Sequence, residues 1–130
     1  MSSLYRVSVK ALIRDKAGKI LLAREESGLW DLLGGGIKQG ESPKDCLEHE
    51  IKEETGLLCR IISKEPKTFF LSKTSKGVPS AVIVYGVELN IKDFITLQEC
   101  QELRFFSMLD LNKLELSHYV VDLQKYYLHK

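Results

Sequence analysis

Apolar and polar residues alternate near the start of the chain in a pattern that predicts β-structure. Apolar side chains occupy every second position from Val7 to Ile13, as in a strand with one buried face. A turn is expected at 15–18, because Gly18 can adopt a positive φ. The apolar run at 19–24 then predicts a second strand, which would form a hairpin with the first.

The clearest helix is expected at Pro43–Thr55. Ser42 can cap its first turn, where a proline is also tolerated. Leu47 and Ile51 are four residues apart and mark one apolar face. Gly56 is suited to end the helix.

The remaining apolar segments predict more strands and a closing helix. Strands are expected at 57–64, Thr68–Lys73, 81–89 and Glu102–Phe106. A helical turn is expected at 109–114, and a helix capped by Ser117 at 117–128. Strands before, between and after helices indicate an α/β fold with a mixed sheet. Without repeats or linkers, residues 1–130 are expected to form a single domain.

Composition narrows the class of protein. The 130 residues are 44% hydrophobic and 28% charged, as in folded soluble domains. A net charge of +1 gives no strong nucleic-acid signature. No apolar run reaches the ~20 residues that span a bilayer, so no membrane partner is expected. Cys46, Cys59 and Cys100 are odd in number and lack a Cys-x-x-Cys pair, which favours a reduced, cytoplasmic location.

Three glutamates lie on one side of the expected helix. Glu50, Glu53 and Glu54 stand at i, i+3 and i+4 and so share an arc of about 100°. Like charges at this spacing disfavour a helix by roughly 0.2–0.5 kcal/mol per pair, which suggests a cation between them. Hard oxygen ligands suit Mg²⁺ or Mn²⁺ better than zinc. The alternative is a solvated acidic face, balanced by Lys44 and Lys52.

A glycine triplet precedes this helix. Glycines at 34–36 let the backbone approach a ligand closely, and exposed N–H groups there can bind phosphate oxygens, although an ordinary tight turn is the alternative. Gly35 is followed by five residues, Glu41, seven residues and His49-Glu50-Ile51, and the string closes at Gly56-Leu57. Chance is a poor explanation for this joint spacing.

This string resembles the Nudix box. The box reads Gly, five residues, Glu, seven residues, Arg-Glu-aliphatic, one residue, Glu-Glu, one residue and Gly-aliphatic. The segment 35–57 matches every fixed position except His49, which stands where the family has arginine. Segment 30–35 is also similar to the family's Trp-x-Leu-Pro-Gly-Gly, with Leu33 in place of proline. Outside 30–57 the likeness is thin.

The resemblance implies a MutT-like hydrolase with an α/β/α sandwich around a central mixed β-sheet. The implied reaction cleaves a phosphoric anhydride bond in a nucleoside diphosphate linked to another group, such as a nucleoside triphosphate. The implied cofactor is Mg²⁺ or Mn²⁺, which offsets phosphate charge and lowers the pKa of a bound water. ADP-ribose-like compounds, dinucleoside polyphosphates and capped RNA stay open as substrates, as does the oligomeric state. The alternative is a non-catalytic nucleotide-binding module on the same fold.

The resemblance also implies roles for individual residues. Metal ligation falls to Gly35, Glu41, Glu50, Glu53 and Glu54. Glu53 is the favoured general base, and the expected catalytic group comprises Glu53, His49, Glu50 and Glu54. A later acid, Glu99 or Glu102, is the alternative base. Substrate binding is expected of Arg24, Gly35 and Gly36.

The departure at His49 leads to a hypothesis. The family's arginine holds the neighbouring glutamate through a forked, charge-assisted hydrogen bond. Histidine is shorter and becomes cationic only in mildly acidic solution. We therefore expect His49 to replace the arginine in part, with a weaker and pH-sensitive orientation of Glu50. The alternative is a surface histidine without a role.

Aromatic and basic residues outside the box have simpler interpretations. Trp30 could stack on a base, but a single tryptophan beside an apolar run is more often a core residue. In the pairs 69–70 and 105–106, one phenylalanine is expected in the core and the other could line a base pocket. Lysines around the Thr68–Lys73 strand are usually solvated, although they could meet polyphosphate or RNA; they are Lys64, Lys67, Lys73 and Lys76.

Overall fold

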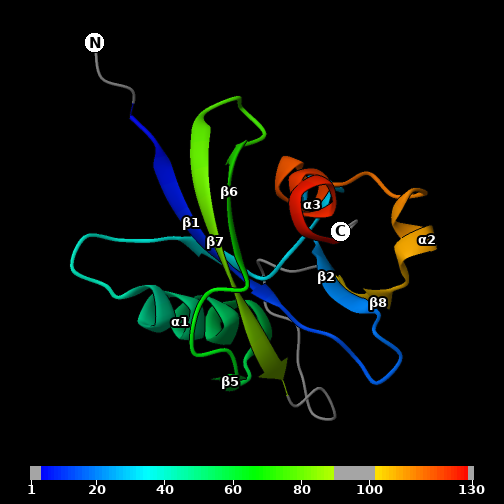
Figure 1. Ribbon diagram of the computed structural model, residues 1–130, viewed down its shortest axis with the longest axis horizontal. Helices are drawn as coiled ribbons and strands as arrows, with labels where there is room; N and C mark the ends of the chain where they lie inside the picture. Colours follow the sequence, from blue (N-terminus) through cyan, green and yellow to red (C-terminus); the bar gives the residue numbers. More distant parts are fainter. Residues whose placement is uncertain (1–3, 90–101, 129–130) are drawn as a thin grey trace.

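The computed structural model describes residues 4–89 and 102–128. These residues form eight strands, three α-helices and a final π-helical segment (Figure 1). The strands are β1 (Arg6–Leu12), β2 (Ile20–Arg24), β3 (Trp30–Asp31), β4 (Gly34–Gly36), β5 (Cys59–Ile61), β6 (Thr68–Lys73), β7 (Pro79–Leu89) and β8 (Glu102–Phe106). The helices are α1 (Pro43–Thr55), α2 (Met108–Leu111), α3 (His118–Leu123) and the π-helical η2 (Gln124–Leu128).

The strands form two sheets. The larger has the order β4-β1-β7-β5, and β6 also pairs with β7. β1 and β7 are parallel, whereas the other pairs are antiparallel, so this sheet is mixed, as expected. The smaller sheet, β3-β2-β8, is antiparallel.

Helices cover both faces of the mixed sheet. Val9 of β1 belongs to a core cluster that includes Leu47 and Ile51 of α1. Val82 of β7 belongs to a second cluster, which includes Val120 of α3. α1 and α3 therefore lie on opposite sides of the sheet (Figure 1), which confirms the expected α/β/α sandwich.

The expected hairpin at the start of the chain forms only at its turn. Arg14 and Ile20 make an isolated antiparallel bridge, and the Leu21 N–H donates to the Ile13 carbonyl at 2.9 Å. Beyond this point β1 joins the larger sheet and β2 the smaller one, so the hairpin prediction was wrong for most of its length. The reason is that consecutive residues of β2 are buried on both faces, which places this strand inside the molecule; they are Ile20, Leu21, Leu22 and Ala23.

Helix α1 has the predicted bounds. Ser42 Oγ accepts the Asp45 N–H at 3.1 Å, and Gly56 ends the helix with a φ of 75°. The strand predicted at 57–64 is shorter, because β5 pairs only with the end of β7 and leaves Leu58 exposed. The helix predicted at 117–128 is α-helical first and then π-helical.

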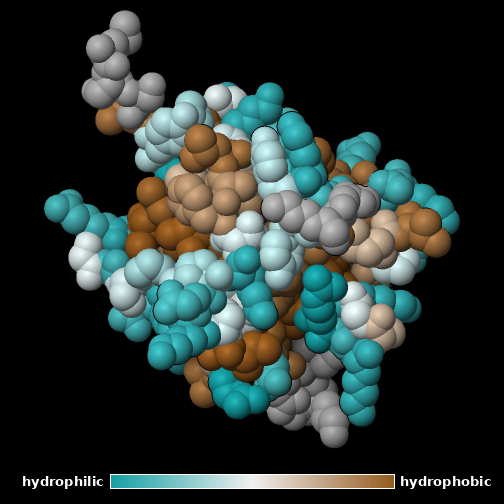
Figure 2. All heavy atoms as spheres, viewed as in Figure 1, coloured by the Kyte–Doolittle hydropathy of each residue, from teal (hydrophilic) through white to brown (hydrophobic). Residues whose placement is uncertain are grey.

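The surface carries both hydrophilic and apolar side chains. Figure 2 shows hydrophilic side chains over much of one face, with apolar patches between them. Within the described part of the chain, we find no helix with the length and apolar character that crossing a membrane requires. Cys46 is buried, as expected of a packing residue, whereas Cys100 lies outside the described residues.

Candidate active site

The glycine triplet forms a strand against which the acidic helix packs. β4 pairs with β1, with Gly34 opposite Lys10 and Gly35 opposite Val9. A Cβ on Gly34 would lie 2.1 Å from the Val9 carbonyl oxygen, so only glycine fits there. A Cβ on Gly35 would lie 2.7 Å from the Glu50 carboxyl carbon. The missing side chain at Gly35 therefore makes room for this carboxylate.

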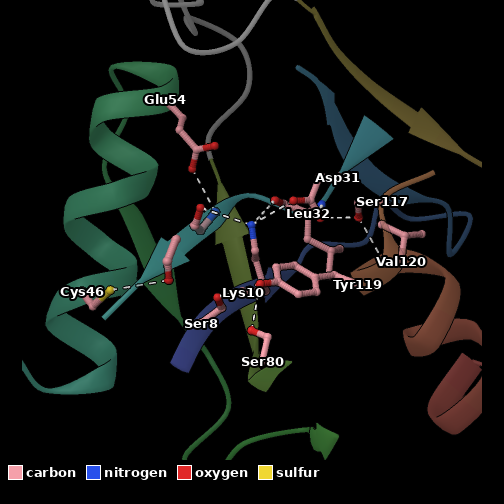
Figure 3. Close-up of polar contacts among 12 residues, drawn as sticks. Ser8, Lys10, Asp31, Leu32, Cys46, Glu54, Ser80, Ser117, Tyr119 and Val120 are labelled. Carbon is pink, nitrogen blue, oxygen red and sulfur yellow. Dashed lines mark hydrogen bonds and ion pairs between the residues drawn. The ribbon is translucent and has the colours of Figure 1, made fainter. Parts of the chain in front are cut away.

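Glu54 is held by the same strand. Its Oε1 accepts the Gly34 N–H at 2.9 Å, so the side chain reaches from α1 to β4 (Figure 3). Burial raises the pKa of Glu54 to about 8. Lys10 and the Gly34 hydrogen bond oppose this shift, whereas Glu50 and Asp31 add to it.

The third glutamate of the expected trio has a different neighbour. Glu53 Oε1 lies 2.8 Å from His49 Nε2, one helical turn earlier, and both side chains are about half exposed. Glu41 lies in the loop before α1, where its Oε1 accepts the Lys38 N–H at 2.9 Å. Among the residues that the structure describes, no three acidic, histidine or cysteine side chains converge as a metal cluster would require.

Two of the three glutamates share an acidic pocket. Glu50 and Glu54 line a cavity of about 360 Å³ together with Glu25, Glu26 and Asp31. Lys10 also lines this acidic pocket. Mg²⁺ commonly binds one or two protein carboxylates and takes its remaining ligands from water and phosphate. The crowded carboxylates and the raised pKa of Glu54 therefore fit a divalent cation.

A basic pocket adjoins the acidic one. It has a volume of about 460 Å³, and its lining includes Arg6, Lys73, Lys76 and His118. Hydroxyl-bearing side chains contribute to its lining, among them Ser8 and Tyr119. The two pockets share Lys10, Glu25 and Asp31. Acidic side chains thus dominate the charged lining of one pocket and basic side chains that of its neighbour.

A buried polar network contains two of the shared residues, Lys10 and Asp31, and the sequence analysis did not identify it. Lys10 Nζ donates to Asp31 Oδ2 at 3.0 Å, and Asp31 Oδ1 accepts the Ser117 hydroxyl at 2.8 Å (Figure 3). Behind them, the Tyr119 hydroxyl shares hydrogen bonds with Ser8 and Ser80 at 3.1 and 2.8 Å. The sequence held no signal for it, because a lysine between apolar neighbours in a predicted strand is expected to face solvent.

Arg24 lies on the smaller sheet. It pairs with Glu102 at 3.3 Å, lies over the Trp30 ring, and lines neither of the two pockets. Trp30 is buried and packs edge-on against Phe106 at 4.8 Å, which confirms its interpretation as a core residue. The alternative base Glu99 lies outside the described residues.

Comparisons with known proteins agree with this fold. A sequence profile described as the NUDIX domain matches residues 4–126. The chain is 30% identical over 120 residues to an ADP-ribose pyrophosphatase from Methanocaldococcus jannaschii, a match that covers 86% of this chain and 68% of that relative. An RNA pyrophosphohydrolase from Saccharophagus degradans is 40% identical over 55 residues, covering 41% and 32% of the two chains.

Solved structures extend the likeness to the whole chain. The crystal structure of a MutT protein from Methanosarcina mazei Go1 superposes with a TM-score of 0.78 and 26% identity. The superposition covers 96% of this chain and 94% of that one. By contrast, the chain spans less than half the length of several curated relatives that it matches.

Proposed function

Since this chain belongs to the NUDIX domain family, we propose that it is a divalent-metal-dependent pyrophosphohydrolase. The observation that carries the proposal is the pair of oppositely charged pockets, which share Lys10, Glu25 and Asp31. Clefts of one charge concentrate ligands of the other. A phosphoric anhydride with its metal ion suits such a pair, because it brings negative phosphates and a divalent cation together.

The acidic pocket is the proposed place of the metal ion. Glu50 and Glu54 would hold Mg²⁺ or Mn²⁺, with Glu41, Glu53 and the backbone of Gly35 as further members of the proposed ligand set. When bound, such an ion neutralises phosphate charge and lowers the pKa of a coordinated water. The protein's own part is to keep these carboxylates beside a glycine strand, where a substrate can approach closely.

Glu53 is the proposed general base. It is about half exposed, so water can reach it, and its Oε1 pairs with the His49 imidazole. This pairing would fix the rotamer of Glu53, whose carboxylate then takes the proton from the attacking water. His49 is thus proposed to position Glu53. Its expected influence on Glu50 stays a prediction.

The basic pocket is the proposed place of the rest of the substrate. Arg6, Lys73 and Lys76 would bind phosphate oxygens, and Gly36 lies in the same pocket wall. The substrate class we propose is a nucleoside diphosphate linked to another group, in line with relatives described as acting on CTP, ADP-ribose and RNA. We further propose a single domain over 1–130 and a cytoplasmic location.

A product-resolved screen tests the proposal. The protein is incubated with nucleoside triphosphates, ADP-ribose, dinucleoside polyphosphates and capped RNA, with Mg²⁺ or Mn²⁺, in ¹⁸O-labelled water. Mass spectrometry and ³¹P NMR then identify the phosphorus atom that receives the solvent oxygen. We expect at least one substrate to be cleaved at its anhydride bond.

Variants distinguish catalysis from binding. Glu53→Gln and Glu54→Gln should each lower kcat by roughly 100-fold or more, as expected for loss of a base or of a metal ligand. Glu65→Gln, an exposed site away from both pockets, is the matched control and should keep full activity. Nucleotide and metal binding without any turnover would instead support the non-catalytic module.

A further inference from the structure

Lys10 is a charged side chain inside the molecule. It lies in β1 between Val9 and Ala11 and is only 5% exposed. An ammonium group is costly to bury unless it is paired and hydrogen-bonded. Burial alone would lower its pKa, but the nearby carboxylates of Asp31 and Glu54 outweigh this effect and raise it. Lys10 is therefore a cation in the folded protein.

All three N–H donors of the Lys10 ammonium group bind acceptors in one short segment of the chain. Nζ donates to Asp31 Oδ2 at 3.0 Å and to the carbonyl oxygens of Leu32 and Gly34, each at 3.3 Å. A lysine has three N–H donors, so these three acceptors saturate it. The acceptors lie within 31–34, which runs from the end of β3 to the start of β4. Lys10 thus ties this segment to β1.

The same segment is anchored from the other side. Asp31 Oδ1 accepts the Ser117 hydroxyl at 2.8 Å and the Leu32 N–H at 2.7 Å. The two oxygens of Asp31 are therefore divided between Lys10 and the start of α3. Figure 3 shows this chain of contacts crossing from β1 to the C-terminal helix.

Gly34 makes hydrogen bonds both to Lys10 and to Glu54 of α1. Its carbonyl accepts from Lys10, and its N–H donates to Glu54 Oε1 at 2.9 Å. A φ of 132° and the close Val9 carbonyl leave no room for another residue there. The positions of Lys10 and Glu54 are therefore linked through the backbone of one glycine.

We propose that Lys10 is a positioning residue of the proposed pyrophosphohydrolase: by holding segment 31–34 against β1 it fixes Gly34, and through the Gly34 N–H it fixes the Glu54 carboxylate in the acidic pocket. The role is indirect, because all three N–H donors of the ammonium group bind acceptors within the protein and none is left for a substrate. Lys10 also lies outside 30–57, the part of the sequence that resembles the Nudix box. The inference rests on the proposed function.

Kinetics of Lys10→Met provide the first test. Methionine has a similar length but no charge and no donor. We expect kcat to fall by about 10- to 100-fold, the usual effect of removing a residue that orients a ligand. KM should stay within about threefold, because Lys10 binds no substrate directly. Lys19→Met, the same change in an exposed turn, should leave both constants unaltered.

Amide hydrogen exchange provides a test that needs neither metal nor substrate. In metal-free Lys10→Met, the Gly34 amide should exchange at least tenfold faster than in the wild type. The Leu21 amide, which is bonded to the Ile13 carbonyl in the core, should not change and serves as the internal reference. Unchanged Gly34 exchange together with unchanged kcat would overturn the role of Lys10. A wild-type protein inactive on every nucleotide would instead overturn the proposed function.

A second variant covers the case in which Lys10→Met fails to fold because Asp31 is left buried without its partner. Lys10→Met/Asp31→Asn removes both charges together, which is often tolerated. We expect this double variant to fold and to show the same fast Gly34 exchange and low kcat. A double variant with wild-type kcat and Gly34 exchange would contradict the proposal.

Discussion

At the scale of single residues, a substitution of Gly35 should affect the stability of the fold and the catalytic rate to different extents. The nearest atoms to a Cβ at this position are those of the Glu50 carboxylate, the far end of a flexible side chain. Gly35→Ala should therefore change the free energy of unfolding by less than about 1 kcal/mol, because that carboxylate can swing away. The displaced Glu50 should lower kcat by at least about tenfold. Urea denaturation and steady-state kinetics measure the two effects.

Gly36→Ala is the matched comparison. A Cβ at Gly36 would meet the end of the Arg6 side chain, 2.5 Å away, and not a glutamate. Its kcat should fall less than that of Gly35→Ala. Equal losses in the two variants would show that the strand, and not Glu50, is what the extra methyl group disturbs.

Glu54 gives the metal-free protein a pH-dependent stability. Burial raises its pKa from an ordinary 4.5 to about 8, so between these values the folded state binds a proton that the unfolded state has released. The contribution of Glu54 to stability is therefore lost as the pH rises from 4.5 to 8. We expect Glu54→Gln to be more stable than the wild type at pH 8, by a few kcal/mol.

Urea denaturation in EDTA across this pH range measures the effect. Near pH 4.5 the two proteins should have similar stability, since Glu54 is then protonated in the folded state. A wild-type protein that gains stability relative to Glu54→Gln as the pH rises would contradict the burial of this carboxyl group.

Only some of these residues could be found from the sequence. The spacing of Gly35, Glu50 and Glu54 identified residues that the fold does bring together. Lys10 could not be found in this way, because a lysine in an alternating strand normally indicates the solvent side. Its face of β1 is instead covered by α3, and that tertiary contact leaves no local pattern.

At the scale of secondary structure, a serine hydroxyl caps each of the three described α-helices, and the caps of α1 and α3 have different surroundings. Ser42 Oγ accepts the Asp45 N–H at the start of α1, whereas Ser117 Oγ accepts the Val120 N–H and also donates to Asp31. Ser42→Ala should cost about 1 kcal/mol. Ser117→Ala should cost more, because a buried carboxylate loses a donor as well. Thermal denaturation of both variants measures the difference.

The reliability of the predicted elements follows from their local chemistry. α1 was predicted with its observed bounds, because a capping serine, a proline and a terminal glycine mark both of its ends. The prediction of a hairpin around the turn at 15–18 was wrong for most of its length. Turn residues determine where the chain reverses, but they do not determine the partners of the strands beyond the turn. Those partners depend on β7 and β8, more than 50 residues away along the sequence.

At the scale of the whole molecule, the two pockets give the protein a charge separation that its net charge hides. The formal charge is only +1, yet acidic side chains predominate in the lining of one pocket and basic ones in that of the other. Composition therefore could not reveal the anion-binding side, because that property arises only when the fold gathers Arg6 with the β6–β7 hairpin.

Removing two of these cations should weaken substrate binding selectively. Lys73→Gln/Lys76→Gln should raise KM several-fold with little change in kcat, because both lysines line the basic pocket. The KM of the wild type should also rise with salt, and more steeply than that of the variant. Lys19→Gln, away from both pockets, should keep the wild-type KM and salt dependence.

The parallel pairing of β1 with β7 has a consequence for how the protein is made. Arg6 lies opposite Ser80, so β1 leaves the ribosome more than 70 residues before its central partner, β7. Pairings this distant in sequence form late. During translation the acidic helix emerges well before the sheet that orients its carboxylates can close, so the charged cavities form only after β7 and the start of α3 have been made.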